Sequence, residues 1–247
     1  TYTATDNDGA ASAAITYPLL IINRPVAVDD RAVVIPNSTN VPIRPFRNDT
    51  DPDTAPAVAF SALDSTSVRI PTDAAFNGQP RNGTATVSNG VITYTPNSGF
   101  EGRDSIRYII CDRTPNTVGH PQRGPLCDTA TIIIDVRQPF IPEGFSPNGD
   151  QIHDFFVVEN PNNEPIELKV FNRWGSLVYE TGNFRQDELT YDAAGQPSNF
   201  SSARSDWSGT ANRGLRVGEE LPDGTYFYII KYRNSGFTKA RYLTLMR

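Results

Sequence analysis

The sequence predicts an all-β protein built of antiparallel β-sandwiches. β-Branched runs recur along the chain at 26–35, 85–95, 105–112 and 129–136, and each is bounded by Asn, Asp, Gly or Pro. No stretch of a dozen residues carries the 3.6-residue apolar stripe of an amphipathic helix. The best helix candidate, 184–189, lacks a second turn of apolar positions. We therefore expect almost no helix.

The charge and the short apolar runs of the chain argue against a nucleic-acid-binding protein and a transmembrane segment. The chain of 247 residues is long enough for two modest domains, each with its own core. The net charge is −6, with 11 basic and 14 acidic residues on each side of the division at residue 139, so neither half has the basic excess of a nucleic-acid binder. No apolar run approaches the roughly 20 residues that span a bilayer, so we expect no transmembrane segment.

The sequence offers little for catalysis. Its two histidines, His120 and His153, both lie in turn-like sequence, and there are only two cysteines. A triad or a catalytic metal site needs such groups within reach of one another. We expect no enzymatic activity and no required cofactor.

An internal repeat predicts the domain organisation. Residues 2–16 resemble 108–132, and each copy has the order strand, Asp-containing turn, strand. We therefore expect residues 1–23 to be the last strands of a preceding repeat, 24–139 to be a complete module and 140–247 to be a different domain. The chain is then expected to be the C-terminal end of a longer protein. Below, residues 24–139 are the first module and 140–247 the second module.

The first module resembles the bacterial immunoglobulin-like or cadherin-like repeats of large surface proteins. The resemblance rests on segments 25–30, 48–53, 83–96 and 99–108, in that order. It implies tandem immunoglobulin-like antiparallel β-sandwiches that act as a stalk and have no chemistry of their own.

Aspartates in the first module form a candidate calcium site. Alternating carboxylates in a loop can point at one hard cation, and like charges this close repel unless something neutralises them. The alternative is an Asp-rich turn whose side chains cap backbone amides. The candidate ligands are Asp29, Asp30, Asp49, Asp51, Asp53 and Asp112.

Two cysteines predict a disulfide. Cys111 and Cys127 enclose 15 residues between two predicted neighbouring strands. Closing such a loop stabilises a fold by about 3 kcal/mol in the chain-entropy model, and the bond persists in an oxidising compartment, in keeping with export through the periplasm. Two buried free thiols are the alternative.

The second module carries a series of motifs in order. They are Phe-x-Pro-Asn-Gly-Asp at 145–150, Phe-x-Arg-Trp-Gly at 171–175, Trp-x-Gly at 207–209 and Pro-Asp-Gly-Thr-Tyr-x-Tyr at 222–228. The residues that carry these motifs are Phe145, Pro147, Asn148, Gly149, Asp150, Asp154, Phe171, Arg173, Trp174, Gly175, Trp207, Gly209, Asp223, Gly224 and Tyr226. We expect Trp174 and Trp207 to be packing residues, and the alternative is that their rings are platforms on which sugars stack.

These motifs resemble the gliding-motility-associated C-terminal domain, which is the type B sorting domain of the type IX secretion system of Bacteroidota. The sequence departs from the family at Gln151 and His153, where Gly and Asn are common, and both changes argue against calcium in that loop. The resemblance implies export through the periplasm to the cell surface. It also implies recognition by the outer-membrane translocon and a PorP/SprF-like membrane protein. A large SprB-like gliding adhesin is the whole protein that this arrangement suggests.

Basic residues near the end of the sequence are candidate partner contacts. Strand alternation predicts that each pair on a strand shares a face, which provides a surface for an acidic partner groove or an edge open to an added strand. The alternative is edge protection against aggregation. The residues are Lys231, Arg233, Lys239, Arg241 and Arg247.

The competing function is a carbohydrate- or surface-binding adhesive module without a sorting role. That function needs exposed, coplanar aromatic rings in the polar loop of the second module. The available residues are Phe184, Tyr191 and Phe200.

Overall fold

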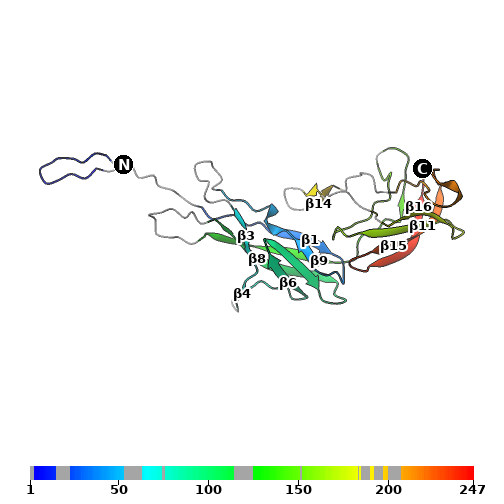
Figure 1. Ribbon diagram of the computed structural model, residues 1–247, viewed down its shortest axis with the longest axis horizontal. Coiled ribbons are helices and arrows are strands. Elements are labelled where there is room, and N and C mark those ends of the chain that lie inside the picture. Colours follow the sequence, from blue (N-terminus) through cyan, green and yellow to red (C-terminus); the bar gives the residue numbers. More distant parts are fainter. Residues whose placement is uncertain are drawn as a thin grey trace.

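The computed structural model describes residues 3–14, 23–52, 63–73, 76–113, 125–150, 152–182, 184, 190–191, 197–199 and 207–247. Within these ranges the helical segments are two 3₁₀ turns, η1 (Pro45–Arg47) and η3 (Gly214–Arg216), so the expectation of almost no helix is confirmed. In the same part of the chain no helix has the length and apolar character needed to cross a membrane. Figure 1 shows the two modules end to end along the long axis of the molecule.

The first module is a two-sheet β-sandwich. Its strands are β1 (Asp30–Val34), β2 (Val41–Ile43), β3 (Leu63–Arg69), β4 (Thr72–Asp73), β5 (Phe76–Asn77), β6 (Gly83–Ser88), β7 (Val91–Pro96), β8 (Gly102–Asp112) and β9 (Cys127–Val136). One sheet has the order β1-β9-β8-β3 and the other β2-β7-β6, while β4 and β5 form a small hairpin. The predicted immunoglobulin-like fold class is confirmed here.

Alternation of side chains explains this sandwich. In β8 and β9 every second residue is buried, and Ile106 and Ile132 lie opposite each other in the register and are fully buried. β1 runs parallel to β9, with Val34 opposite Val136. The apolar faces of the two sheets share one core.

The second module is built on one five-stranded sheet. Its strands are β10 (Gly144–Phe145), β11 (Ile166–Phe171), β12 (Leu177–Thr181), β13 (Thr190–Tyr191), β14 (Pro197–Asn199), β15 (Gly224–Tyr232) and β16 (Thr238–Leu245). The sheet order is β10-β16-β15-β11-β12, and β13 pairs with β14.

A layer of bridged loops covers the inner face of this sheet. Phe156 pairs with Trp207 and Thr210 with Glu220 through isolated β-bridges, and these segments pack on the inward side chains of β15. The modules thus have separate cores, with one exception. Ile35 belongs by sequence to the first module but packs in the core of the second. The predicted domain boundaries at 23 and 139 stay predictions.

Candidate functional site

Aromatic motif residues far apart in the sequence gather in one cluster of the second module. The Trp207 ring lies 5.3 Å from the ring of Phe145 and 6.4 Å from that of Tyr226, between ring centroids. Trp207 is 2% exposed, and its indole N–H donates to the carbonyl of Thr210 at 2.8 Å. Packing was predicted for this tryptophan and is confirmed. These three motif residues hold the fold and are not a contact surface.

Gly209 belongs to the same cluster. It has φ +84°, and a Cβ built on it would lie 2.7 Å from Cδ1 of Leu245. The positive φ favours glycine, and a Cβ at this position would also displace the end of the Leu245 side chain. The Trp-x-Gly motif is therefore explained by packing against β16.

The loop of the first motif is closed by its own side chains. The amide of Gly149 donates to Asp154 Oδ1 at 2.8 Å, that of Asp150 to Asn148 Oδ1 at 3.0 Å and that of Ile152 to Asp150 Oδ1 at 2.7 Å. His153 adopts φ +57°, a conformation that Asn, the usual family residue, adopts readily. The side-chain oxygens of Asn148, Asp150 and Asp154 accept from backbone amides, and this role explains these positions without a cation. Gln151 lies outside the described residues.

Trp174 differs from Trp207. It is 74% exposed, so the prediction that it packs is wrong. It sits in the turn between β11 and β12, which Asn172 organises by accepting from the amides of Trp174 and Ser176 at 3.1 and 2.9 Å. The turn projects the ring outward, and the Arg173 guanidinium lies 4.2 Å from its centroid.

Two further exposed apolar residues lie near this turn. Leu215 lies in η3 and Val217 directly follows it. Gly214, the first residue of η3, is close to the start of β12, since a Cβ built on it would lie 3.3 Å from the carbonyl oxygen of Leu177. We call Arg173, Trp174, Leu215 and Val217 the distal tip. Sequence reasoning missed Leu215 and Val217, because an apolar residue in a short turn carries no periodic signal.

The predicted basic residues are mostly paired. Arg233 lies 2.8 Å from Glu167, Arg241 lies 3.5 Å from Glu143, and Arg247 lies 3.5 and 3.6 Å from Glu220 and Asp223. These ion pairs reduce the local positive charge that the sequence suggests.

The register also separates the basic residues. Lys239 and Arg241 are the cross-strand partners of the buried residues Ile230 and Tyr228, so both lie on the inner face of the sheet. Lys231 is the partner of Thr238 and lies on the outer face. The strand pairs therefore do not form one continuous basic surface. Partner contact by these residues stays a prediction.

Two of the candidate calcium ligands in the first module accept hydrogen bonds from backbone amides. Asp29 accepts from the Thr131 amide at 2.8 Å and Asp112 from the Leu126 amide at 2.8 Å. Among the residues that the structure describes, no three or more His, Cys, Asp or Glu are grouped so that they could hold a metal ion. Asp53 lies outside those residues. The observed hydrogen bonds match the alternative in which the side chains cap amides.

Asp30 and Asp49 form a buried carboxyl pair in this region. Asp49 accepts from the Val28 amide at 2.8 Å and from the hydroxyl of Tyr108 at 3.1 and 3.0 Å, whereas Oδ2 of Asp30 accepts no hydrogen bond from any described residue. Burial and, secondarily, the charge of Asp49 raise the pKa of Asp30 to about 7. Burial raises the pKa of Asp49 to about 6. Asp51 is also buried. Both carboxyl groups of the pair therefore lose their protons at a higher pH than ordinary aspartates do.

The disulfide prediction is confirmed. Cys111 and Cys127 are bonded and lie opposite each other at the ends of β8 and β9. The bond closes the loop of residues 112–126 at the point where the ladder ends. The alternative of two free thiols is excluded.

Of the three loop residues proposed for carbohydrate binding, the one with a described side chain presents no exposed ring. Phe184 is fully buried in the core of the second module. The side chain of Tyr191 and all of Phe200 lie outside the part of the chain that is described.

Each module matches a family model. Residues 140–245 match the family model described as CHU_C Type IX secretion signal domain, and residues 23–120 match the model described as Bacterial Ig domain. No curated protein matches the chain.

Solved structures with some similarity are cadherin ectodomains. Drosophila N-cadherin EC1-4 is 15% identical with a TM-score of 0.26, and the match covers 91% of this chain and 49% of that one. Zebrafish RET cadherin-like domains 1 to 4 are 10% identical with a TM-score of 0.31, covering 91% of this chain and 51% of that one. The chain spans about half the length of these structures. At such values the fold assignment rests on the strands themselves.

Proposed function

We propose, from the match of residues 140–245 to a type IX secretion signal domain, that the second module directs this chain through the periplasm to the exterior of the outer membrane. The first module, which matches a bacterial Ig domain, is exported with it as a stalk element. Both are non-enzymatic kinds of module. We propose that the function is recognition and display and involves no reaction. The whole protein that fits this arrangement is a large surface adhesin of the gliding type.

The family match is the observation that carries this proposal, and the aromatic cluster supports it. The motifs around Phe145, Trp207 and Tyr226 are explained by one shared core, so the sequence that matches the family is also the sequence that builds the module. A module of this kind presents a defined surface to the translocon.

The distal tip is the surface that we propose for the outer-membrane partner, a PorP/SprF-like protein. Trp174 belongs to a family motif yet does not pack, and exposed aromatic and Arg side chains are the groups that dominate binding energy in protein interfaces. The tip lies at the end of β11 away from the first module. Ile166, at the other end of that strand, pairs with Tyr232, whose hydroxyl bonds to the carbonyl of Glu159 beside the module junction. The tip is therefore free of the first module.

Export of a reporter tests the proposal. The full chain is fused to the C-terminus of a periplasm-directed fluorescent protein in a bacterium with a type IX system, and surface fluorescence is measured with and without the PorP/SprF-like partner. We expect surface arrival that requires the partner. Retention in the periplasm would contradict the sorting function.

A matched pair of variants tests the tip. Trp174→Ala is expected to lower surface arrival about tenfold, on the scale of one interface residue worth about 1.4 kcal/mol. Phe140→Ala removes an aromatic ring of similar exposure, 68%, at the junction end of the module and is expected to leave export unchanged. Equal export of the Trp174→Ala variant and the wild type would contradict contact through the tip.

A further inference from the structure

Two consecutive residues at the end of β1 belong to two different cores. Val34 is fully buried in the core of the first module, and Ile35 is fully buried in the core of the second. Successive side chains of an extended chain point to opposite sides, so one residue pair can serve both modules. The second module thus completes its core with a side chain from the first.

The turn after Ile35 is bound to the second module. The side chain of Asn162 accepts from the Ile35 amide at 3.4 Å and donates to the hydroxyl of Ser38 at 2.6 Å. Ser38 is itself buried and donates to the Ile35 carbonyl at 2.6 Å. The side chain of Asn162, in the second module, therefore forms hydrogen bonds to both ends of this turn.

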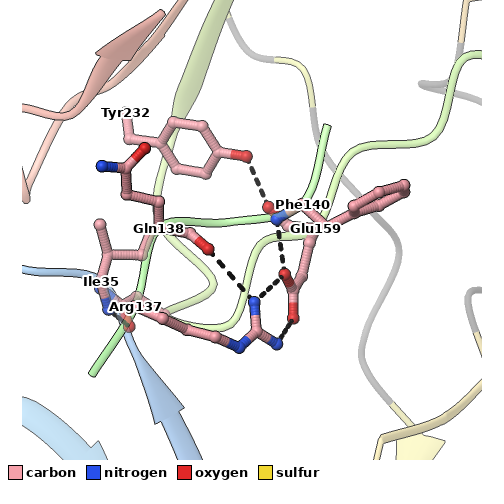
Figure 2. Close-up of polar contacts among 7 residues, drawn as sticks. Ile35, Arg137, Gln138, Phe140, Glu159 and Tyr232 are labelled. Atoms are coloured by element: carbon pink, nitrogen blue, oxygen red, sulfur yellow. Dashed lines mark hydrogen bonds and ion pairs between the residues drawn. The ribbon is translucent and has the colours of Figure 1, made fainter. Parts of the chain in front are cut away.

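A second connection runs beside the first. The amide of Arg137, directly after β9, donates to the carbonyl of Val34 at 3.0 Å, so the two strands leave the first module side by side. The Arg137 guanidinium then donates to both carboxylate oxygens of Glu159, at 2.7 and 2.6 Å. Figure 2 shows the two planar groups facing each other. Bidentate Arg–carboxylate pairs are among the strongest and most directional polar contacts.

Glu159 is held from both its side chain and its backbone. Its carboxylate accepts from the Phe140 amide at 2.7 Å, and its own amide donates to the Phe140 carbonyl at 2.9 Å. The Tyr232 hydroxyl, at the end of β15, donates to the Glu159 carbonyl (Figure 2). The clamp is therefore anchored to the main sheet of the second module.

We infer that the first module is a required part of the sorting unit: Ile35 fills a socket in the second module, and the Arg137–Glu159 clamp fixes the angle between the two. A single covalent linker permits rotation, whereas two adjacent attachments, one covalent and one packed, restrict it. The export machinery then receives the described parts of the two modules at one fixed relative orientation. The functional part of this inference rests on the proposed sorting function. The mechanical part does not.

Tryptophan fluorescence tests the coupling in the full chain. Both tryptophans, Trp174 and Trp207, belong to the second module, so their signal reports the unfolding of that module alone. We expect Ile35→Ala to lower the melting temperature of this transition by about 10 °C, although the substituted residue lies in the first module by sequence. An unchanged transition would overturn the inference.

A matched isoleucine gives the control. Ile106 is fully buried in the core of the first module and has no place in the second. Ile106→Ala is expected to lower the tryptophan transition in the wild-type background and to lower it less when Ile35→Ala is also present, because the packed contact is then lost while the Asn162 and Arg137 contacts still join the modules. A tryptophan transition that ignores Ile106→Ala in both backgrounds would show independent modules and overturn the inference.

The clamp has its own test, which does not depend on the stability of either core. Spin labels at the exposed positions Ser88 and Ser176, one in each module, report the distance between the modules. We expect a narrow distance distribution that broadens in Arg137→Ala. A broad distribution in the unsubstituted chain would contradict the rigid junction.

The export assay distinguishes a failure of this inference from a failure of the proposed sorting function. In the reporter assay, the chain with Ile35→Ala and Arg137→Ala together is expected to reach the surface at least tenfold less than the wild-type chain. Equal export of both chains would overturn the requirement for the first module. Failure of the wild-type chain to be exported would instead contradict the sorting function itself.

Discussion

Replacement of Asp30 by Asn is expected to stabilise the protein at pH 8. Asp30 is 7% exposed, its Oδ2 accepts no hydrogen bond from the described residues, and its pKa is raised to about 7, mainly by burial. The adjacent Asp49, with a pKa of about 6, carries a second charge at this pH. Both carboxylates are therefore charged at pH 8 in a site that favours their neutral forms.

The size of the effect follows from the pKa. The ordinary value is 3.8 and the folded value about 7, and at 1.36 kcal/mol per unit a rise of about three units corresponds to about 4 kcal/mol. Burying any polar side chain here retains part of that cost, so we expect Asp30→Asn to recover about half, or about 2 kcal/mol.

The direction of the pH dependence follows from proton binding. Between about pH 4 and pH 7 the folded state binds more protons than the unfolded state, because its pKa is the higher one. The free energy of unfolding therefore falls as the pH rises through this range and levels off above it. In Asp30→Asn this decline is expected to shrink to the part due to Asp49.

Urea unfolding followed by far-UV circular dichroism at pH 5 and pH 8, with a chelator present, measures both effects. Asp29→Asn is the matched control, because Asp29 is the exposed neighbour and Asn retains an oxygen to accept from Thr131. We expect the control to gain much less than Asp30→Asn at pH 8, because the charge of Asp29 contributes only a minor part of the raised pKa of Asp30. If the wild type is more stable at pH 8 than at pH 5, or if Asp30→Asn gains nothing at pH 8, the reasoning is refuted. Repeating the pH 8 series with calcium tests the predicted ion: a rise in stability that Asp30→Asn abolishes would show that a cation, not a proton, neutralises the pair.

Two further stability effects are expected. Reduction of the Cys111–Cys127 bond should lower the free energy of unfolding by about 3 kcal/mol, measured by urea unfolding with and without reductant. An unchanged urea midpoint would show that closing the loop contributes nothing to stability. Gly209→Ala should lower the free energy of unfolding by about 2 kcal/mol, because of the positive φ and the 2.7 Å approach to Leu245, and tryptophan fluorescence should show a lower melting temperature. Gly149→Ala is the control, because its φ is similar but the space around its Cβ position is open, and it should lower the stability less. Equal losses in the two variants would show that the close contact is not a cause.

The sequence by itself determined the fold class, the disulfide and the resemblance of the second module to a secretion-signal family. These features rest on local signals: strand alternation with a period of two, turn residues such as Gly209, and cysteines at the ends of neighbouring strands. Each of these signals can be recognised from a few consecutive residues or from the two strands of one hairpin. The confirmed burial of Trp207 belongs to the same group, because it lies within a motif that builds the core.

Only the tertiary structure decided which residues face a partner and which join the modules. Trp174 and Trp207 are the same residue type in motifs of one family, yet one is exposed and the other buried, because exposure depends on which distant segments fold over a turn. Ile35 directly follows strand β1 of the first module and gives no local sign that it fills the core of the second. The pKa of Asp30 likewise depends on Asp49, 19 positions away, and on the burial that the sandwich imposes on both. Such properties are set by contacts between segments far apart in the chain, which local patterns do not encode.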